Sequence, residues 1–152
     1  MKKVILLICM LIFVTGCSSG GKEDGTKETG KTIEILETKS ETPDVELKAE
    51  SKEFALINIT YANKSEKDYY TGKGWKYYYR KDDKSEWEEL VPENYKVTQE
   101  GLAIKAGKDF NQELNLTEIF KGKELEKGEY KAENIVSAKE EQKKVEFTFK
   151  IQ

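Results

Sequence analysis

The side chains in this sequence that are best suited to binding chemistry form a cluster of aromatic residues. Tryptophan and tyrosine rings suit stacking on a sugar ring or contact with an apolar patch of a partner protein. The cluster comprises Tyr69, Tyr70, Trp75, Tyr77, Tyr78, Tyr79 and Trp87. Strand alternation places Trp75, Tyr77 and Tyr79 on one face, which we expect to belong to the core, and Tyr78 on the other. We expect Tyr69, Tyr70 and Tyr78 to be exposed and take them as candidate binding residues.

Residues that would support catalysis or metal binding are few. The sequence has no histidine, which removes the commonest general base and the commonest transition-metal ligand. The acidic pairs Asp82-Asp83, Glu88-Glu89 and Glu140-Glu141 lack the spacing of a calcium loop, and we interpret them as solvated turns and strand edges. No nucleophile motif or phosphate-binding loop is present in the sequence. We therefore predict a non-catalytic protein without metal or cofactor, with a hydrolase that uses an unrecognised carboxylate pair as an alternative.

The first 17 residues have the organisation of an export signal. Lys2 and Lys3 precede an apolar run from residue 4 to residue 14, which is too short to cross a bilayer and ends in small residues before Cys17. The sequence Val14-Thr15-Gly16-Cys17 resembles the lipobox of bacterial lipoproteins. The resemblance implies that residues 1–16 are removed and that Cys17 becomes the lipidated N-terminus. Ordinary signal cleavage beside an incidental cysteine is the alternative.

The export signal predicts a location at the outer face of the bacterial cytoplasmic membrane. Removal of Lys2 and Lys3 changes the net charge from −3 to −5, and no basic block remains, so we expect no nucleic-acid partner. Attachment to the lipid bilayer would rest on the acylated Cys17, because two acyl chains suffice for stable anchoring. We expect a further protein or cell-wall partner whose identity the sequence does not give. Cys9 leaves with the signal, so the mature domain depends on a packed core rather than a disulfide.

Two regions of different composition follow the signal. Residues 17–44 are rich in Ser, Gly, Lys and Glu and predict a flexible polar tether. Within it, residues 32–37 alternate apolar and polar side chains, and they either add an edge strand or remain a disordered patch. Residues 45–152 consist of short alternating runs between turn residues, which indicates an all-β domain of about seven to eight antiparallel strands. We expect a two-sheet sandwich, with a small barrel as the competing architecture.

The clearest alternation predicts which side chains face the core. Ile57, Ile59 and Tyr61 should point inward from one strand, and Val145, Phe147, Phe149 and Ile151 from the last strand. We expect strands over residues 45–49, 54–61, 75–80, 87–91, 102–104, 110–116, 128–136 and 145–151. Between residues 117 and 126 the spacing of apolar residues allows a single helical turn.

Several of these segments, in this order, resemble those of bacterial immunoglobulin-like domains in exported and lipid-anchored proteins of low-GC Gram-positive bacteria. The stretch Ile57–Lys64 is similar to a strand that ends in an Asn-containing turn, and Leu125-x-x-Gly128-x-Tyr130 resembles the corner before the penultimate strand. Lys127 stands where a proline often precedes the glycine. The resemblance covers residues 45–152 and implies an immunoglobulin-like sandwich without catalytic residues, in which the Tyr130 hydroxyl bonds to upstream backbone.

These observations together predict a lipid-anchored, exported protein that carries a non-catalytic immunoglobulin-like binding or accessory module. A lipoprotein that binds a small ligand or a glycan through the aromatic cluster is the main alternative.

Overall fold

The structure is a computed structural model that describes residues 30–93, 96–97 and 100–152. The described residues form ten strands and one short helix. They are β1 (Ile33–Ser40), β2 (Val45–Glu53), β3 (Leu56–Asn63), β4 (Tyr69–Gly72), β5 (Lys76–Arg80), β6 (Glu88–Leu90), β7 (Gly101–Ile104), β8 (Asp109–Asn115), α1 (Leu116–Ile119), β9 (Gly128–Ala138) and β10 (Glu141–Ile151). The helix is the single turn expected after residue 117, and the side chain of Asn115 caps it by accepting from the amides of Thr117 and Glu118.

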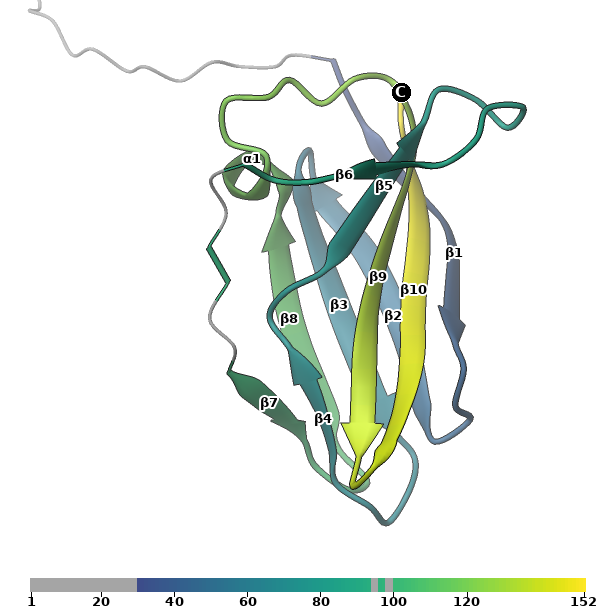
Figure 1. Ribbon diagram of the computed structural model, residues 1–152, viewed down its shortest axis with the longest axis vertical. Helices are drawn as coiled ribbons and strands as arrows, with labels where there is room; N and C mark the ends of the chain where they lie inside the picture. Colours follow the sequence, from purple (N-terminus) through teal and green to yellow (C-terminus); the bar gives the residue numbers. More distant parts are fainter. Residues whose placement is uncertain (1–29, 94–95, 98–99) are drawn as a thin grey trace, which may run out of the picture.

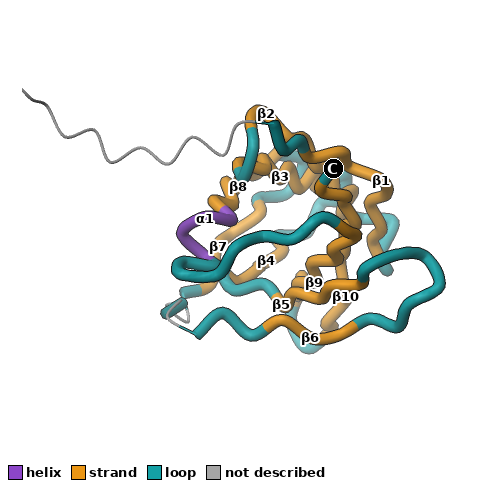
Figure 2. Tube along the Cα trace, turned by 90° about the horizontal axis from the view of Figure 1, so that it is seen from above, coloured by secondary structure: helices purple, strands orange, loops and turns teal. Residues whose placement is uncertain are grey.

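The strands lie in two antiparallel sheets that face each other (Figures 1 and 2). The larger sheet has the order β1-β10-β9-β4-β7, and β5 pairs with β9 and carries β6 at its outer edge. The smaller sheet has the order β2-β3-β8. The prediction of an all-β, two-sheet antiparallel sandwich is confirmed, and the barrel is excluded because the two sheets remain separate.

The strand β9 organises the larger sheet. It pairs with β10 from Gly128 opposite Ile151 to Ala138 opposite Glu141. Its other edge is divided between two strands, because β4 pairs with residues 136–137 and β5 pairs with residues 129–133. The segment that joins β4 to β5 therefore runs alongside the middle of β9, where a single partner strand would otherwise continue.

The expected core positions are confirmed. Ile57, Ile59 and Tyr61 of β3 are fully buried, and so are Val145, Phe147, Phe149 and Ile151, the alternate residues of β10 in the other sheet. Trp75 connects the two sets, because its ring lies 5.3 Å from that of Phe147 and 6.4 Å from that of Tyr61. Trp75 and Tyr77 are core residues, as predicted. Aromatic pairs of this kind contribute about 0.5–1.5 kcal/mol beyond the area that they bury.

Two strands differ from the sequence-based expectations. The edge strand that residues 32–37 left open is formed, because β1 (Ile33–Ser40) pairs with β10. The tether of residues 17–44 is therefore too long as predicted, and the folded region begins before residue 45. Ile33 and Ile35 pack against the core, and this apolar contact holds β1 on the domain. The strand β4 was not predicted. Its four residues, Tyr69–Gly72, are too few to show a clear alternation.

The corner before β9 has the geometry that the sequence predicts. Tyr130 is buried, and its hydroxyl donates a 2.8 Å hydrogen bond to the backbone oxygen of Glu126. Gly128 adopts a φ of +150° and packs so closely on β5 that a Cβ atom would lie 2.6 Å from Cε2 of Tyr79. The glycine and the tyrosine therefore fix the direction in which the chain enters β9.

A buried polar cluster joins the two sheets beside Trp75. Asn134 of β9 donates to the backbone oxygen of Gly72 at 2.9 Å and to the Tyr61 hydroxyl at 3.3 Å. Gln112 of β8 accepts from the Trp75 indole at 3.3 Å and donates to the backbone oxygen of Lys73 at 3.2 Å. These bonds satisfy the polar groups of the segment that joins β4 to β5, which would otherwise be partly buried without partners.

We predict that Tyr130→Phe lowers the free energy of unfolding by about 1–3 kcal/mol, because the backbone oxygen of Glu126 loses its donor. Chemical denaturation of the full chain measures the change. Tyr70→Phe is the matched control, because the Tyr70 ring is 46% exposed, and we expect little change there. A Tyr130→Phe variant as stable as the wild type would mean that the corner bond contributes nothing.

We also predict that Asn134→Leu lowers the free energy of unfolding by about 1–3 kcal/mol, because it leaves the Gly72 carbonyl without its donor while keeping a similar volume. The control is Asn111→Leu, since Asn111 is exposed on β8 and bonds only to the exposed Thr60 hydroxyl. Equal stabilities of the two variants, measured by denaturation, would contradict a structural role for the buried amide.

Candidate functional site

The three tyrosines that we selected as binding residues have different environments. Tyr69 is buried, with 1% of its surface exposed, so the expectation that it is exposed is wrong. It occupies an inward position of β4 opposite the buried Ile104, and its hydroxyl donates a 2.7 Å bond to Asp44. Burial raises the pKa of Tyr69, and the hydrogen bond to Asp44 raises it further. The ring of Tyr69 therefore belongs to the core, and its hydroxyl reaches Asp44 at the edge of the core.

Tyr70 and Tyr78 lie on the outer face of the larger sheet but do not form one patch. Tyr70 is 46% exposed and pairs with Ser137, whereas Tyr78 is half-buried and pairs with Lys131. Six residues of β9 separate these two positions, a distance of roughly 20 Å along the strand. The predicted candidates therefore belong to two separate surfaces.

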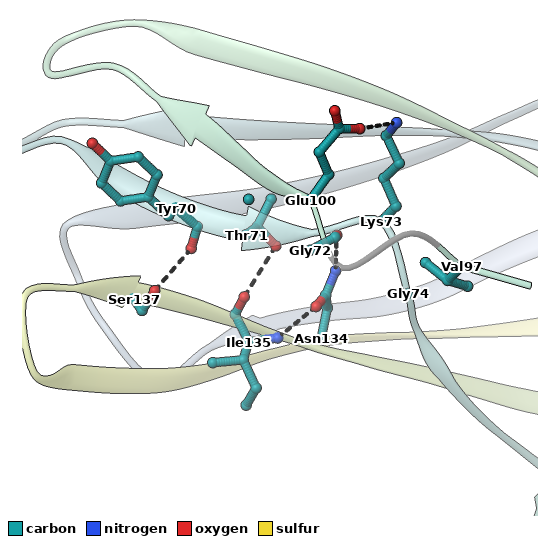
Figure 3. A pocket seen from close by; sticks show the side chains of 11 residues that line it. Tyr70, Thr71, Gly72, Lys73, Gly74, Val97, Glu100, Asn134, Ile135 and Ser137 are labelled. Carbon is teal, nitrogen blue, oxygen red and sulfur yellow. Dashed lines mark hydrogen bonds and ion pairs between the residues drawn. The ribbon is translucent and has the colours of Figure 1, made fainter.

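Tyr70 borders a hollow of about 560 Å³ on the outer face of the larger sheet (Figure 3). The described residues include five large apolar side chains that are exposed, and three of them, Tyr70, Val97 and Ile135, line this hollow. A concentration of exposed apolar groups around one concave surface is typical of an interaction site. We refer to this surface as the Tyr70 hollow.

Side-chain bonds to the backbone hold the floor of the Tyr70 hollow in place. Thr71 donates to the backbone oxygen of Ile135 at 3.0 Å, and Ser137 donates to that of Tyr70 at 3.4 Å. Asn134 adds its bond to Gly72 from the core side of the same strand (Figure 3). The shape of the hollow is therefore set by the packing of β4 on β9 before any partner arrives.

The charges at the Tyr70 hollow are confined to its rim. Lys73 and Glu100 form an exposed ion pair at 2.8 Å, and the hydrogen bond from Lys73 lowers the pKa of the Glu100 carboxyl. Glu100 is the one carboxylate among the described lining residues, so the hollow lacks the opposed pair that a glycosidase needs. The chemistry of this surface suits contact with an apolar group of a partner.

Of the apolar residues at the hollow, Tyr70 is among the predicted binding residues and Ile135 is not. Alternation along β9 places residues 130, 132, 134 and 136 inward, so Asn134 is a polar residue facing the core and Ile135 an apolar residue facing out. This inversion of the usual pattern was visible in the sequence. Ile135 is 43% exposed because it occupies an outward position of β9, next to Asn134, whose inward amide bonds to the β4–β5 segment.

A second surface surrounds Trp87 at the other end of β9. The Arg80 guanidinium lies 4.5 Å from the centroid of the Trp87 ring, and the Lys131 amine lies 4.4 Å from that of the Tyr78 ring. Both cations are also paired, Arg80 with Glu129 and Lys131 with Glu133. At the Trp87 surface the cations already contact the aromatic rings and pair with carboxylates of the same domain. We therefore place the candidate site at the Tyr70 hollow.

The acidic pairs named in the sequence analysis are turns and strand edges in the structure. Asp82 accepts from the amide of Lys84 and the hydroxyl of Ser85, and these bonds lower the pKa of its carboxyl. Glu88 and Glu89 follow one another on β6, and Glu140 lies in the turn before β10. In the described part of the chain, no group of three or more potential metal ligands occurs.

The predicted lipidation site at Cys17 and the signal of residues 1–16 lie outside the described residues. Over the ranges that the structure does describe, no helix has the length and apolar character required to cross a membrane.

Comparison with known protein families gives one match. The model of the bacterial Ig-like domain family matches residues 37–150, which include all strands from β2 to β9, the second half of β1 and most of β10. No enzyme family was found, and the comparison with curated proteins gave no match. The match agrees with the two-sheet antiparallel architecture and with the resemblance seen at the Tyr130 corner. The chain belongs to the bacterial Ig-like domain family.

Proposed function

We propose that this protein is an exported lipoprotein whose Ig-like domain is a non-catalytic module that binds a protein partner through the Tyr70 hollow. The observation that carries this proposal is the gathering of three of the five exposed large apolar side chains of the described residues around one preformed hollow. Apolar groups that remain exposed together on a surface gain free energy when a partner removes them from water, at about 25 cal/mol per Å².

The position of the hollow suits a membrane-anchored protein. The described chain enters the domain at one end of the sandwich, where the amide of Gln152 donates to the backbone oxygen of Thr32. Ile135 lies seven residues along β9 from Gly128 at that end, which is roughly 20–25 Å. If Cys17 carries the lipid, the tether joins the domain at the entry end, and the Tyr70 hollow lies toward the far end, where the anchor leaves it accessible.

The anchor is tested by the variant Cys17→Ser. We expect the wild-type chain to enter the detergent phase in a phase-partitioning experiment, and the variant to remain in the aqueous phase because it lacks the acyl chains. A variant that enters the detergent phase as the wild type does, or a wild-type chain found in the aqueous phase, would contradict lipidation at Cys17.

The binding surface is tested by site-specific photo-crosslinking in intact cells. A photoreactive phenylalanine analogue is placed at Tyr70, and the matched control carries it at Leu36, which is 44% exposed on the opposite edge strand β1. We expect a discrete crosslinked protein from position 70 and none from position 36.

The variant Ile135→Glu shows whether the crosslink depends on the hollow. Ile135 is 43% exposed on the outer face of β9, so the new carboxylate stays in water in the free protein and the melting temperature should change little. We expect this change to abolish crosslinking from position 70, because a charge would be buried at the interface. Undiminished crosslinking in this variant, or equal crosslinking from position 36, would show that the hollow is not the binding surface.

A further inference from the structure

A second cavity lies at the end of the sandwich where the described chain enters. It has a volume of about 290 Å³, close to the lower bound of about 300 Å³ for small-molecule sites. Aromatic and aliphatic side chains form its apolar wall, namely Tyr79, Leu90, Phe120, Leu125 and Tyr130. The hydroxyls of Tyr79 and Tyr130 bond to the backbone oxygens of Lys127 and Glu126, which fixes both rings in the wall.

The rim of this cavity carries three carboxylates, of which one is paired with a cation. Glu88, Glu124 and Glu126 line it. Glu124 pairs with Lys31 at 2.8 Å, but Glu88 and Glu126 have no cation within 4 Å among the residues that the structure describes. Lys123 also lines the cavity and opposes part of this charge.

The carboxylates of the rim lie close enough to the wall tyrosines to affect their pKa values. Burial raises the pKa of Tyr79, and the charges of Glu126, Glu88 and Asp82 raise it further. Burial likewise raises the pKa of Tyr130, with a contribution from Glu126. The carboxylates of the rim therefore act on the aromatic wall, and not only on the surrounding water.

From the rings, the unpaired carboxylates and the small volume, we infer that this cavity binds a small organic ammonium ion. Aromatic rings attract such cations through their negative faces, and carboxylates supply the counter-charge. The apolar wall accommodates the alkyl groups of the ion, which a metal cation would leave without contact. The cavity lies at the opposite end of β9 from the Tyr70 hollow, so this inference goes beyond the proposed function and does not depend on it.

The test uses choline chloride as the probe and its uncharged carbon isostere, dimethylbutanol, as the control ligand. The full chain is purified in a maltoside detergent, which contains no ammonium group, and binding is followed by saturation-transfer NMR on the ligand methyl groups at constant ionic strength. We expect saturable transfer to choline and none to dimethylbutanol, because the two differ only in the charge.

Three variants assign the binding to this cavity. Glu88→Gln and Glu126→Gln should each weaken choline binding by about fivefold or more, whereas Lys123→Gln should strengthen it. The matched control is Glu113→Gln, an exposed residue of β8 in the other sheet, which should leave the affinity unchanged. Melting temperatures identify any variant that fails to fold. The variants that do fold then show whether choline binds in this cavity.

The inference is overturned if choline and dimethylbutanol give equal transfer, if choline gives none, or if folded Glu88→Gln and Glu126→Gln variants bind choline as the wild type does. None of these outcomes bears on the Tyr70 hollow, because the crosslinking experiment reads a different surface.

Discussion

The strand β9 is hydrogen-bonded along both of its edges, and the rest of the structure depends on that pairing. One edge is occupied by β10 along its full length, and the other is shared by β4 and β5. Its inward side chains enter the core, and its two ends contribute to two cavities. Ile135 lines the Tyr70 hollow, and Tyr130 lines the cavity at the end where the described chain enters. A strand held on both sides positions these residues without a disulfide.

The sequence could predict those parts of the fold that follow from local alternation. The inward sets of β3 and β10 repeat every second residue, and burying them together requires two facing sheets. The Tyr130 corner was predictable because a glycine in a rare conformation and a tyrosine two residues later form a local motif. The edge strand β1 could be named only as one of two possibilities, since its stability comes from pairing with β10 at the far end of the chain.

The candidate site was less predictable because it depends on contacts between distant segments. Tyr69 and Tyr70 are adjacent and chemically identical, so the sequence does not reveal which of them faces the core. The pairing of β4 with β7 and β9 decides it, since it places Tyr69 opposite the buried Ile104 and Tyr70 opposite Ser137. A strand of four residues has too little alternation to reveal that register in advance.

The same alternation separates stability from binding in this domain. Along β9, Tyr130 faces inward and holds the corner, and Asn134 faces inward and holds the β4–β5 segment. Ile135, the next residue, faces outward. A change at an inward position removes a buried bond, whereas a change at an outward position alters the surface with little effect on the free energy of unfolding. The outer face of the larger sheet can therefore change while the inward face keeps the fold. In this domain, whose sequence has no cysteine after residue 17, the Asn134 amide and the Tyr130 corner supply buried bonds that the fold depends on.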